Sequence, residues 1–172
     1  MYRETRPSAA KRSRRPARLA DPRIYLRLVM GIAALALAAV SLPQFADVAR
    51  SISRPVPEQG SGCRVLSVID GDTVTLWCPG TGAQRARLTG FDTPEVFSPG
   101  CTAEWRRGVQ AAWALRRMLW AADEVRVVRG GTDRYGRTLA AVFLDGEPVA
   151  RRMIAEGHAR PYSGGPRAGW CA

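Results

Sequence analysis

The stretch Cys63–Cys78, CRVLSVIDGDTVTLWC, begins the folded part of this chain. Strand-forming residues lie on both sides of Asp70-Gly71, and an Asp-Gly pair between two such runs predicts a β-hairpin with a two-residue type I′ turn. In that hairpin Cys63 and Cys78 lie opposite each other on the two strands. The stretch therefore predicts a hairpin whose first and last residues are joined by a disulfide.

The cysteines of the chain indicate an oxidising compartment. There are four, and all of them follow an apolar segment near the N-terminus: Cys63, Cys78, Cys101 and Cys171. If the hairpin pair forms, the second disulfide joins Cys101 to Cys171 and ties the C-terminus to the loop before the next predicted helix. Two disulfides fit an exported domain, whereas a zinc site is disfavoured because no two cysteines have the C-x-x-C spacing.

The order of elements after the hairpin predicts the fold class. We expect a third strand at 86–91, an amphipathic helix at 102–122, strands at 125–128 and 139–144, and a second helix from Pro148 to Gly157. Five short strands with a helix after the third are typical of the OB-fold. The prediction is an α+β domain, a β-barrel with helices built as a five-stranded OB-fold Greek-key barrel and preceded by one N-terminal apolar helix.

In the predicted helix at 102–122, apolar residues recur about every three or four positions, with arginines between them. This spacing predicts that one face is buried and the other solvated. We expect the tryptophans to belong to the core and the arginines to the solvated face: Trp105, Trp113 and Trp120 inside, Arg106, Arg107, Arg116 and Arg117 outside.

The N-terminal part of the chain combines strong basic charge with a long apolar run. The 172 residues have a net charge of +11, and residues 1–27 hold most of it, with nine basic and two acidic side chains. Residues 28–42 carry no charge, and the basic flank predicts that the N-terminal end stays in the cytoplasm. The run is either a retained membrane anchor or a cleaved signal peptide.

These patterns divide the chain into four predicted regions: a basic cytoplasmic tail at 1–27, a transmembrane anchor or signal segment at 28–45, a linker at 46–62 and a folded domain at 63–172. The expected location is the cell envelope, as a single-pass membrane protein with the folded domain on the non-cytoplasmic, periplasmic or extracellular side. If the apolar segment is cleaved, the domain is secreted.

Three polar motifs lie at predicted strand ends. They are I-D-G-D-T at 69–73, R-x-x-x-x-D-T-P-E at 87–95 and D-R-Y-G-R at 133–137. Taken singly, each has an ordinary structural explanation, such as exposed acids in a loop or a charged turn. Their order, and the elements between them, favour a single site built at several strand ends of one barrel.

The three motifs resemble the staphylococcal nuclease (thermonuclease) family from about Cys63 to Tyr162. The resemblance implies a Ca²⁺ ion held by Asp72, Asp92 and the backbone carbonyl of Thr93, which are the hard oxygen ligands that calcium prefers. It implies that Glu95 is the base that activates a water molecule near the metal, and that Arg87 and Arg137 contact the phosphate with bidentate hydrogen bonds. It further implies that Arg134, Tyr135 and Tyr162 bind substrate.

From this resemblance we expect an enzyme: an exported or membrane-anchored, Ca²⁺-dependent nuclease that hydrolyses phosphodiester bonds of DNA and RNA. We expect a monomer, attached to the membrane by its apolar helix and without a protein partner. The alternative is a non-catalytic OB-fold module that binds single-stranded nucleic acid or a protein. Such a module has no need to keep Asp72, Arg87, Asp92, Glu95 and Arg137 together.

Overall fold

The computed structural model describes residues 22–55 and 60–171, and the chain divides into two compact units, Met1–Val40 and Ser41–Ala172. Helix α1, Pro22–Ser53, begins in the first unit and ends in the second. Its apolar part is long enough to cross a membrane, and that part is not buried inside the protein. Residues 46–53, which we expected in the linker, form the last two turns of this helix.

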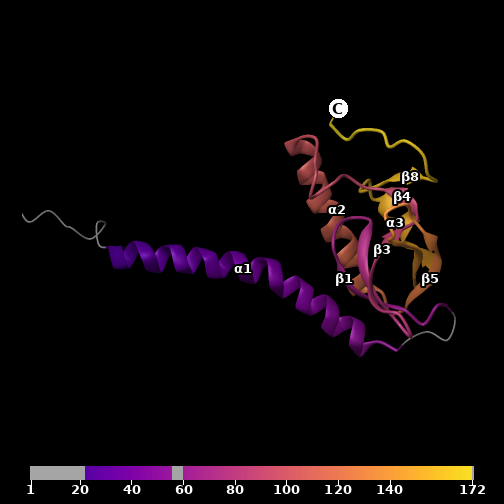
Figure 1. Cartoon of the computed structure of the whole chain (residues 1–172), viewed down its shortest axis with the longest axis horizontal. Helices are drawn as coiled ribbons and strands as arrows, with labels where there is room; N and C mark the ends of the chain where they lie inside the picture. The colour runs from indigo at the N-terminus through magenta and orange to yellow at the C-terminus, as the bar shows by residue number, and fades with distance from the viewer. Residues whose placement is uncertain (1–21, 56–59, 172) are drawn as a thin grey trace, which may run out of the picture. The chain divides into compact units, whose positions relative to one another are not determined.

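A mixed sheet forms the centre of the second unit (Figure 1). Its strand order is β1-β2-β3-β6-β5, with a short strand β7 beside β6; β3 and β6 are parallel and the other pairs are antiparallel. The bounds are β1 Arg64–Val68, β2 Thr73–Cys78, β3 Gly82–Leu88, β5 Val125–Thr132, β6 Thr138–Leu144 and β7 Glu147–Pro148. With its helices, this sheet confirms the α+β class.

The third predicted strand is two strands in the structure. β3 ends at Leu88, and the chain resumes as β4, Gly90–Asp92, which pairs with β8, Arg160–Tyr162, in a separate two-stranded sheet. Gly90 has φ +93°, a conformation that glycine adopts at no steric cost, and it redirects the chain between the two sheets. This change of direction places Asp92 near the end of β3.

The hairpin differs from its prediction at the turn. Val68 pairs with Val74, so the loop is longer than two residues, and the backbone N–H groups of Ile69 and Asp70 both donate to the carbonyl of Thr73. A bulge between Val65 and Ser67 restores the pairing further along the strands. The type I′ turn was therefore wrong. The structure nevertheless contains both expected disulfides, Cys63–Cys78 and Cys101–Cys171.

The glycine of the Asp-Gly pair serves close packing. A Cβ atom at Gly71 would lie 2.8 Å from the Cβ of Ala111 and 2.8 Å from the Oγ1 of Thr93. The φ of Gly71 lies outside the left-handed region that a type I′ turn requires. The residue therefore lets the hairpin loop approach helix α2, Thr102–Ala121, and the segment after β4.

Helix α2 buries Ala111, Ala114 and Leu115 in the core, and helix α3, Val149–Ala155, adds Val149 and Met153. The expectation for the tryptophans was wrong in part, because Trp105 and Trp113 are 46% and 41% exposed. On a helix that covers a sheet, the small side chains on the inner face allow the close approach, and the bulky rings lie toward its margins.

The last turns of α1 explain a second wrong expectation, that Arg116 lies on a solvated face. Arg116 is buried, and its Nε donates to Oδ2 of Asp47 at 2.9 Å, while its Nη2 donates to the carbonyl of Val68 at 3.0 Å. The Nε1 of Trp120 donates to Oδ1 of Asp47 at 2.8 Å, and the backbone N–H of Val68 donates to Oδ2. Every group of this cluster has a partner, as a buried ion pair requires.

Candidate active site

The first two motifs meet at one buried arginine. Arg87, at the end of β3, lies between two aspartates: its Nη1 is 2.8 Å from Oδ2 of Asp72, and its Nη2 is 3.1 Å from Oδ1 of Asp92. All three side chains are buried. Because a buried carboxylate requires a partner, the guanidinium fixes the positions of both acids.

Backbone contacts hold Asp72 in this place. Its carbonyl accepts a hydrogen bond from the N–H of Leu88 at 2.7 Å, which ties the hairpin loop to the end of β3. Its carboxylate accepts from the hydroxyl of Thr73 at 3.0 Å and from the backbone N–H of Thr93 at 3.4 Å. Asp72, Asp92 and the Thr93 backbone are thereby brought together.

The site contains more acid than its arginines balance. Asp70 accepts a hydrogen bond from the N–H of Asp72 at 3.0 Å and lies in the same loop. Burial, and the negative charge of Asp72, raise the pKa of Asp70 to about 6. Surplus carboxylates in a partly desolvated position are an environment that an additional cation stabilises. The available donors are carboxylate and carbonyl oxygens, which fit a hard cation such as Ca²⁺.

Glu95 lies at the solvent side of this cluster, with 41% of its side chain exposed. Glu104 of α2 positions the loop that carries it: one carboxylate oxygen accepts from the backbone N–H of Glu95 at 3.3 Å, and the other accepts from the N–H of Gly100 at 2.7 Å. Glu104 is itself buried. Both ends of the loop from Glu95 to Gly100 are therefore held by one side chain.

The third motif forms a compact turn between β5 and β6. The carboxylate of Asp133 accepts from the backbone N–H groups of Tyr135 and Arg137, both at 2.9 Å, and from Nε of Arg137 at 2.7 Å. Slight desolvation acts to raise the pKa of Asp133, but these hydrogen bonds and the charge of Arg137 lower it overall. Tyr135 is 68% exposed, with the guanidinium of Arg134 4.8 Å from its ring centre.

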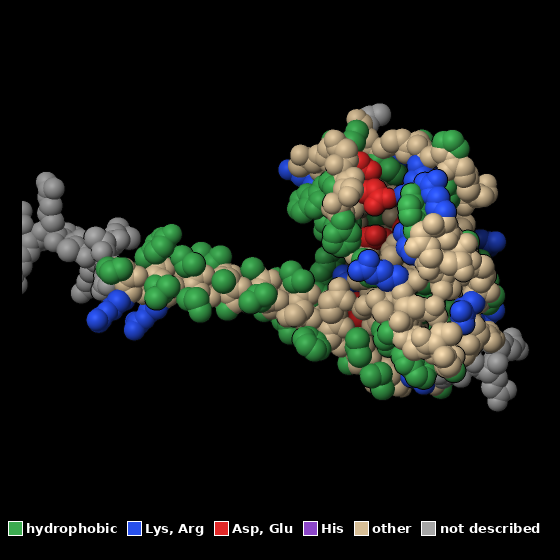
Figure 2. Space-filling model, in the orientation of Figure 1, with side chains coloured by type: hydrophobic (Ala, Val, Ile, Leu, Met, Phe, Trp, Pro, Cys, Tyr) green, Lys and Arg blue, Asp and Glu red, His purple; other side chains and the backbone are tan. Residues whose placement is uncertain are grey.

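An open cleft of about 1180 Å³ is lined by residues of the second and third motifs. Figure 2 shows acidic side chains gathered in a hollow of the surface, with basic side chains along its edge. The predicted site residues that line the cleft are Arg87, Glu95, Arg134, Tyr135, Arg137 and Tyr162. Asp72 and Asp92 lie next to it in contact with Arg87, so the structure brings the predicted residues into one region.

Two residues that were not predicted, Arg167 and Trp170, contact the predicted acids. Nε of Arg167 is 3.0 Å from Oδ1 of Asp92, and its Nη1 pairs with Oε1 of Glu95. Nε1 of Trp170 donates to Oδ2 of Asp92 at 3.3 Å. Both belong to the segment before Cys171, and the predicted disulfide to Cys101 was the signal that placed this segment close to the site.

Comparison with known proteins agrees with the site. Residues 85–168 match the family described as staphylococcal nuclease homologue. The chain is 37% identical over 99 residues to a thermonuclease of Staphylococcus hyicus, covering 56% of this chain and 57% of the relative. It is 32% identical over 102 residues to a thermonuclease of Staphylococcus intermedius, covering 59% and 60%. An uncharacterized endonuclease of Haemophilus influenzae is 32% identical over 100 residues, covering 58% and 52%.

The chain thus spans between about half and three fifths of the length of these relatives. The matched region begins within β3, just before Arg87, and runs past the third motif into the C-terminal segment that contains Arg167. It therefore includes most of the residues that form the cleft. Residues 85–168 of this chain belong to the staphylococcal nuclease family.

Proposed function

We propose that this protein is a Ca²⁺-dependent nuclease that hydrolyses phosphodiester bonds of DNA and RNA. The observation that carries the proposal is the bridge of Arg87 between Asp72 and Asp92, beside a cleft lined by Glu95 and Arg137. Hydrolysis of a phosphodiester requires positive charge around an anion and a base for the attacking water, and this group of residues supplies both. The names of the relatives support the same activity.

In this proposal, Asp72, Asp92 and the carbonyl of Thr93 hold the calcium ion. The surplus of carboxylates at this position supports the assignment, since burial and neighbouring charge already disfavour the ionised form of Asp70. When bound, calcium would supply positive charge that stabilises the charge developing on the attacked phosphate.

Three side chains carry the proposed chemistry. Arg87 and Arg137 donate hydrogen bonds to the phosphate oxygens, a task that suits the planar fork of a guanidinium. Glu95 accepts the proton of the attacking water. Its exposed position at the cleft supports this role, because the base must meet both solvent and substrate.

We assign substrate binding to residues of the third motif and to the last residue of β8. Tyr135 offers an exposed ring for stacking, and Arg134 beside it offers a positive charge for the backbone of a single strand. Tyr162 faces the cleft and lies 5.8 Å from the guanidinium of Arg87, measured from its ring centre. These three residues line the cleft next to the proposed phosphate site.

We further propose that the sheet closes into a five-stranded OB-fold barrel. The strand order β1-β2-β3-β6-β5 places the parallel pair, β3 with β6, inside the order, and residues of β1 and β5 at its two ends contact each other. Closure of this kind covers the unpaired edges that an open sheet would expose.

The proposed location is the non-cytoplasmic side of a membrane. The disulfides indicate an extracytoplasmic environment, and α1 is long and apolar enough to act as a signal or an anchor. The excess of basic residues before α1 supports a cytoplasmic N-terminus with the catalytic domain across the membrane. We propose a retained single-pass anchor; cleavage of α1 would instead release the domain.

The test is cleavage of single-stranded DNA and RNA by the full chain in detergent, comparing Glu95→Gln with Glu156→Gln. The proposed base lies in the cleft, whereas Glu156 is an exposed residue after α3. With Ca²⁺ present, we expect Glu95→Gln to lower turnover by about 10²- to 10⁴-fold and Glu156→Gln to leave it unchanged. Wild-type protein that binds these substrates without cleaving them would contradict the proposal and support the non-catalytic alternative.

A further inference from the structure

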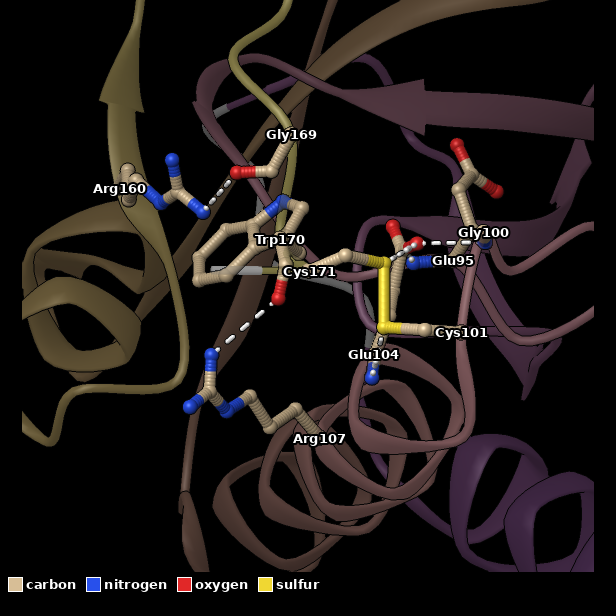
Figure 3. Close-up of a disulfide and its surroundings, with 9 residues drawn as sticks. All are labelled: Glu95, Gly100, Cys101, Glu104, Arg107, Arg160, Gly169, Trp170 and Cys171. Atoms are coloured by element: carbon tan, nitrogen blue, oxygen red, sulfur yellow. Dashed lines mark hydrogen bonds between the residues drawn. A yellow bond between two sulfur atoms is a disulfide. The ribbon is translucent and has the colours of Figure 1, made fainter.

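The C-terminal strap, residues 163–171, is attached to the domain at several points. The hydroxyl of Tyr162 donates to the carbonyl of Gly165 at 2.7 Å, and Nη2 of Arg160 donates to the carbonyl of Gly169 at 2.9 Å. Nη1 of Arg107, on α2, donates to the carbonyl of Trp170 at 3.3 Å. The disulfide from Cys171 to Cys101 closes the strap onto the start of α2 (Figure 3).

An aromatic contact fixes the end of the strap next to the acids. The guanidinium of Arg160 lies 3.4 Å from the ring centre of Trp170, within the range of a cation–π interaction. Figure 3 shows the indole of Trp170 between Arg160 and the disulfide. From this position its Nε1 reaches Oδ2 of Asp92.

The strap thus donates to both oxygens of the Asp92 carboxylate. Oδ1 of Asp92 pairs with the guanidinium groups of Arg87 and Arg167, and Oδ2 accepts a hydrogen bond from Nε1 of Trp170. The guanidinium of Arg167 also pairs with Oε1 of Glu95, so it links Asp92 to Glu95. A metal ion that uses the Asp92 carboxylate must compete with these donors.

We propose that Arg167 is a built-in cation of this carboxylate site and sets its affinity for divalent metal by competing for Asp92 and Glu95. The inference rests on the metal site proposed above. An arginine is suited to this role because it stays charged. Burial acts to lower the pKa of Arg167, but the negative charges of Asp92, Asp72 and Glu95 raise it overall.

Competition by Arg167 is intramolecular, and the Cys101–Cys171 disulfide attaches its segment to the domain at a second point. A tethered group competes at an effective concentration set by its tether, which for a short connection is about millimolar. Arg167 lies only a few residues from Cys171, so the disulfide limits how far its guanidinium can move from the acids. Loss of this tether should weaken the competitor without removing its charge.

The experiment is a calorimetric Ca²⁺ titration of the oxidised full chain in detergent, without substrate. The variants are Arg167→Gln and, as a control with the same change of charge, Arg151→Gln at an exposed position of α3. We expect the dissociation constant for Ca²⁺ to fall about tenfold in Arg167→Gln, which corresponds to about 1.4 kcal/mol, and to stay unchanged in Arg151→Gln. The double variant Cys101→Ser/Cys171→Ser should shift in the same direction by a smaller factor.

Asp92→Asn separates the two proposals. If it abolishes Ca²⁺ binding while Arg167→Gln binds as the wild type does, or more weakly, competition by Arg167 is refuted and the metal site stands. If none of these proteins binds Ca²⁺, the metal site is refuted and the competition fails with it. Tighter binding in Arg167→Gln together with loss in Asp92→Asn supports both.

Discussion

Two clusters in the same domain each combine an aspartate, an arginine and a tryptophan N–H, but only one of them lies beside the cleft. In the structural cluster, Asp47 pairs with Arg116 and accepts from Trp120. In the site cluster, Asp92 pairs with Arg87 and Arg167 and accepts from Trp170. The same chemical groups therefore occur once where α1 meets α2 and once beside the cleft.

Their charge balance and surroundings differ. Asp47 faces one buried guanidinium, and its two carboxylate oxygens also accept from the backbone N–H of Val68 and from Nε1 of Trp120. In the site cluster the acids outnumber the arginines: Asp70, Asp72, Asp92 and Glu95 lie near Arg87 and Arg167. The first cluster is complete in itself, whereas the second gains from another cation and opens on a cleft that can admit one.

The same substitution in each cluster should separate stability from activity, beginning with Asp47→Asn. This change leaves the buried guanidinium of Arg116 without a counter-charge, which costs about 3–5 kcal/mol. We expect that loss in the free energy of unfolding measured by urea denaturation in detergent, with cleavage per folded molecule unchanged. A loss below about 1 kcal/mol would mean that the α1 contact contributes little to the fold.

Asp92→Asn is the matched change in the site cluster. Arg87 keeps Asp72 and Arg167 keeps Glu95, so we expect a smaller loss of stability than for Asp47→Asn. Turnover should fall by at least about 10²- to 10³-fold, because the variant loses the proposed calcium ion that would stabilise the developing charge. Initial rates on single-stranded DNA, together with urea denaturation, measure both quantities. Equal destabilisation in the two variants would remove the distinction between the clusters.

Gly71→Ala tests the close packing of the hairpin loop against α2 and the segment after β4. The added methyl group would lie 2.8 Å from the Cβ of Ala111 and from the Oγ1 of Thr93, so one of these segments must move. We expect a loss of about 1–3 kcal/mol in thermal or chemical unfolding, the usual cost of overpacking. Gly80→Ala is a poorer control, because the space around Gly80 is open but its φ of +81° would add backbone strain. The better control is Ala83→Gly, which changes one methyl group at an exposed position of β3.

The smallest of these effects is expected for Glu104→Gln, which replaces one acceptor oxygen by a donor. One of the hydrogen bonds from Glu95 and Gly100 is then lost, and the loop that carries Glu95 becomes less well positioned. We expect kcat to fall about tenfold, which is about 1.4 kcal/mol, with KM unchanged. A rise in KM at constant kcat would show that Glu104 affects binding of substrate instead of the position of Glu95.

The sequence predicts the local elements well because their signals are local. Hydrophobic periodicity located α2, and the strand-forming runs located most of the sheet. The position of the motifs at predicted strand ends identified Asp72, Arg87 and Asp92 as neighbours. The hairpin turn was predicted wrongly because a glycine can be required either by a positive φ or by close packing. Only the position of Ala111, next to Gly71, shows that close packing is the reason here.

Residues whose partners are distant in the chain could not be placed from pattern alone. Arg116 has the helical spacing of a solvated side chain, and its burial depends on Asp47, which lies 69 residues away. Arg167 lies in a segment without periodicity, and its partner Asp92 is distant in the chain. In both cases the deciding interaction is a tertiary contact that leaves no mark on the local sequence.

We propose that the site cluster is a metal-dependent catalytic centre. The most direct measurement follows cleavage of single-stranded DNA by the oxidised full chain with Ca²⁺, after EGTA, and after Ca²⁺ is restored. We expect cleavage in the first and third conditions and its loss in the second. Cleavage that continues unchanged in EGTA, or DNA that is bound and left intact with Ca²⁺ present, would contradict it.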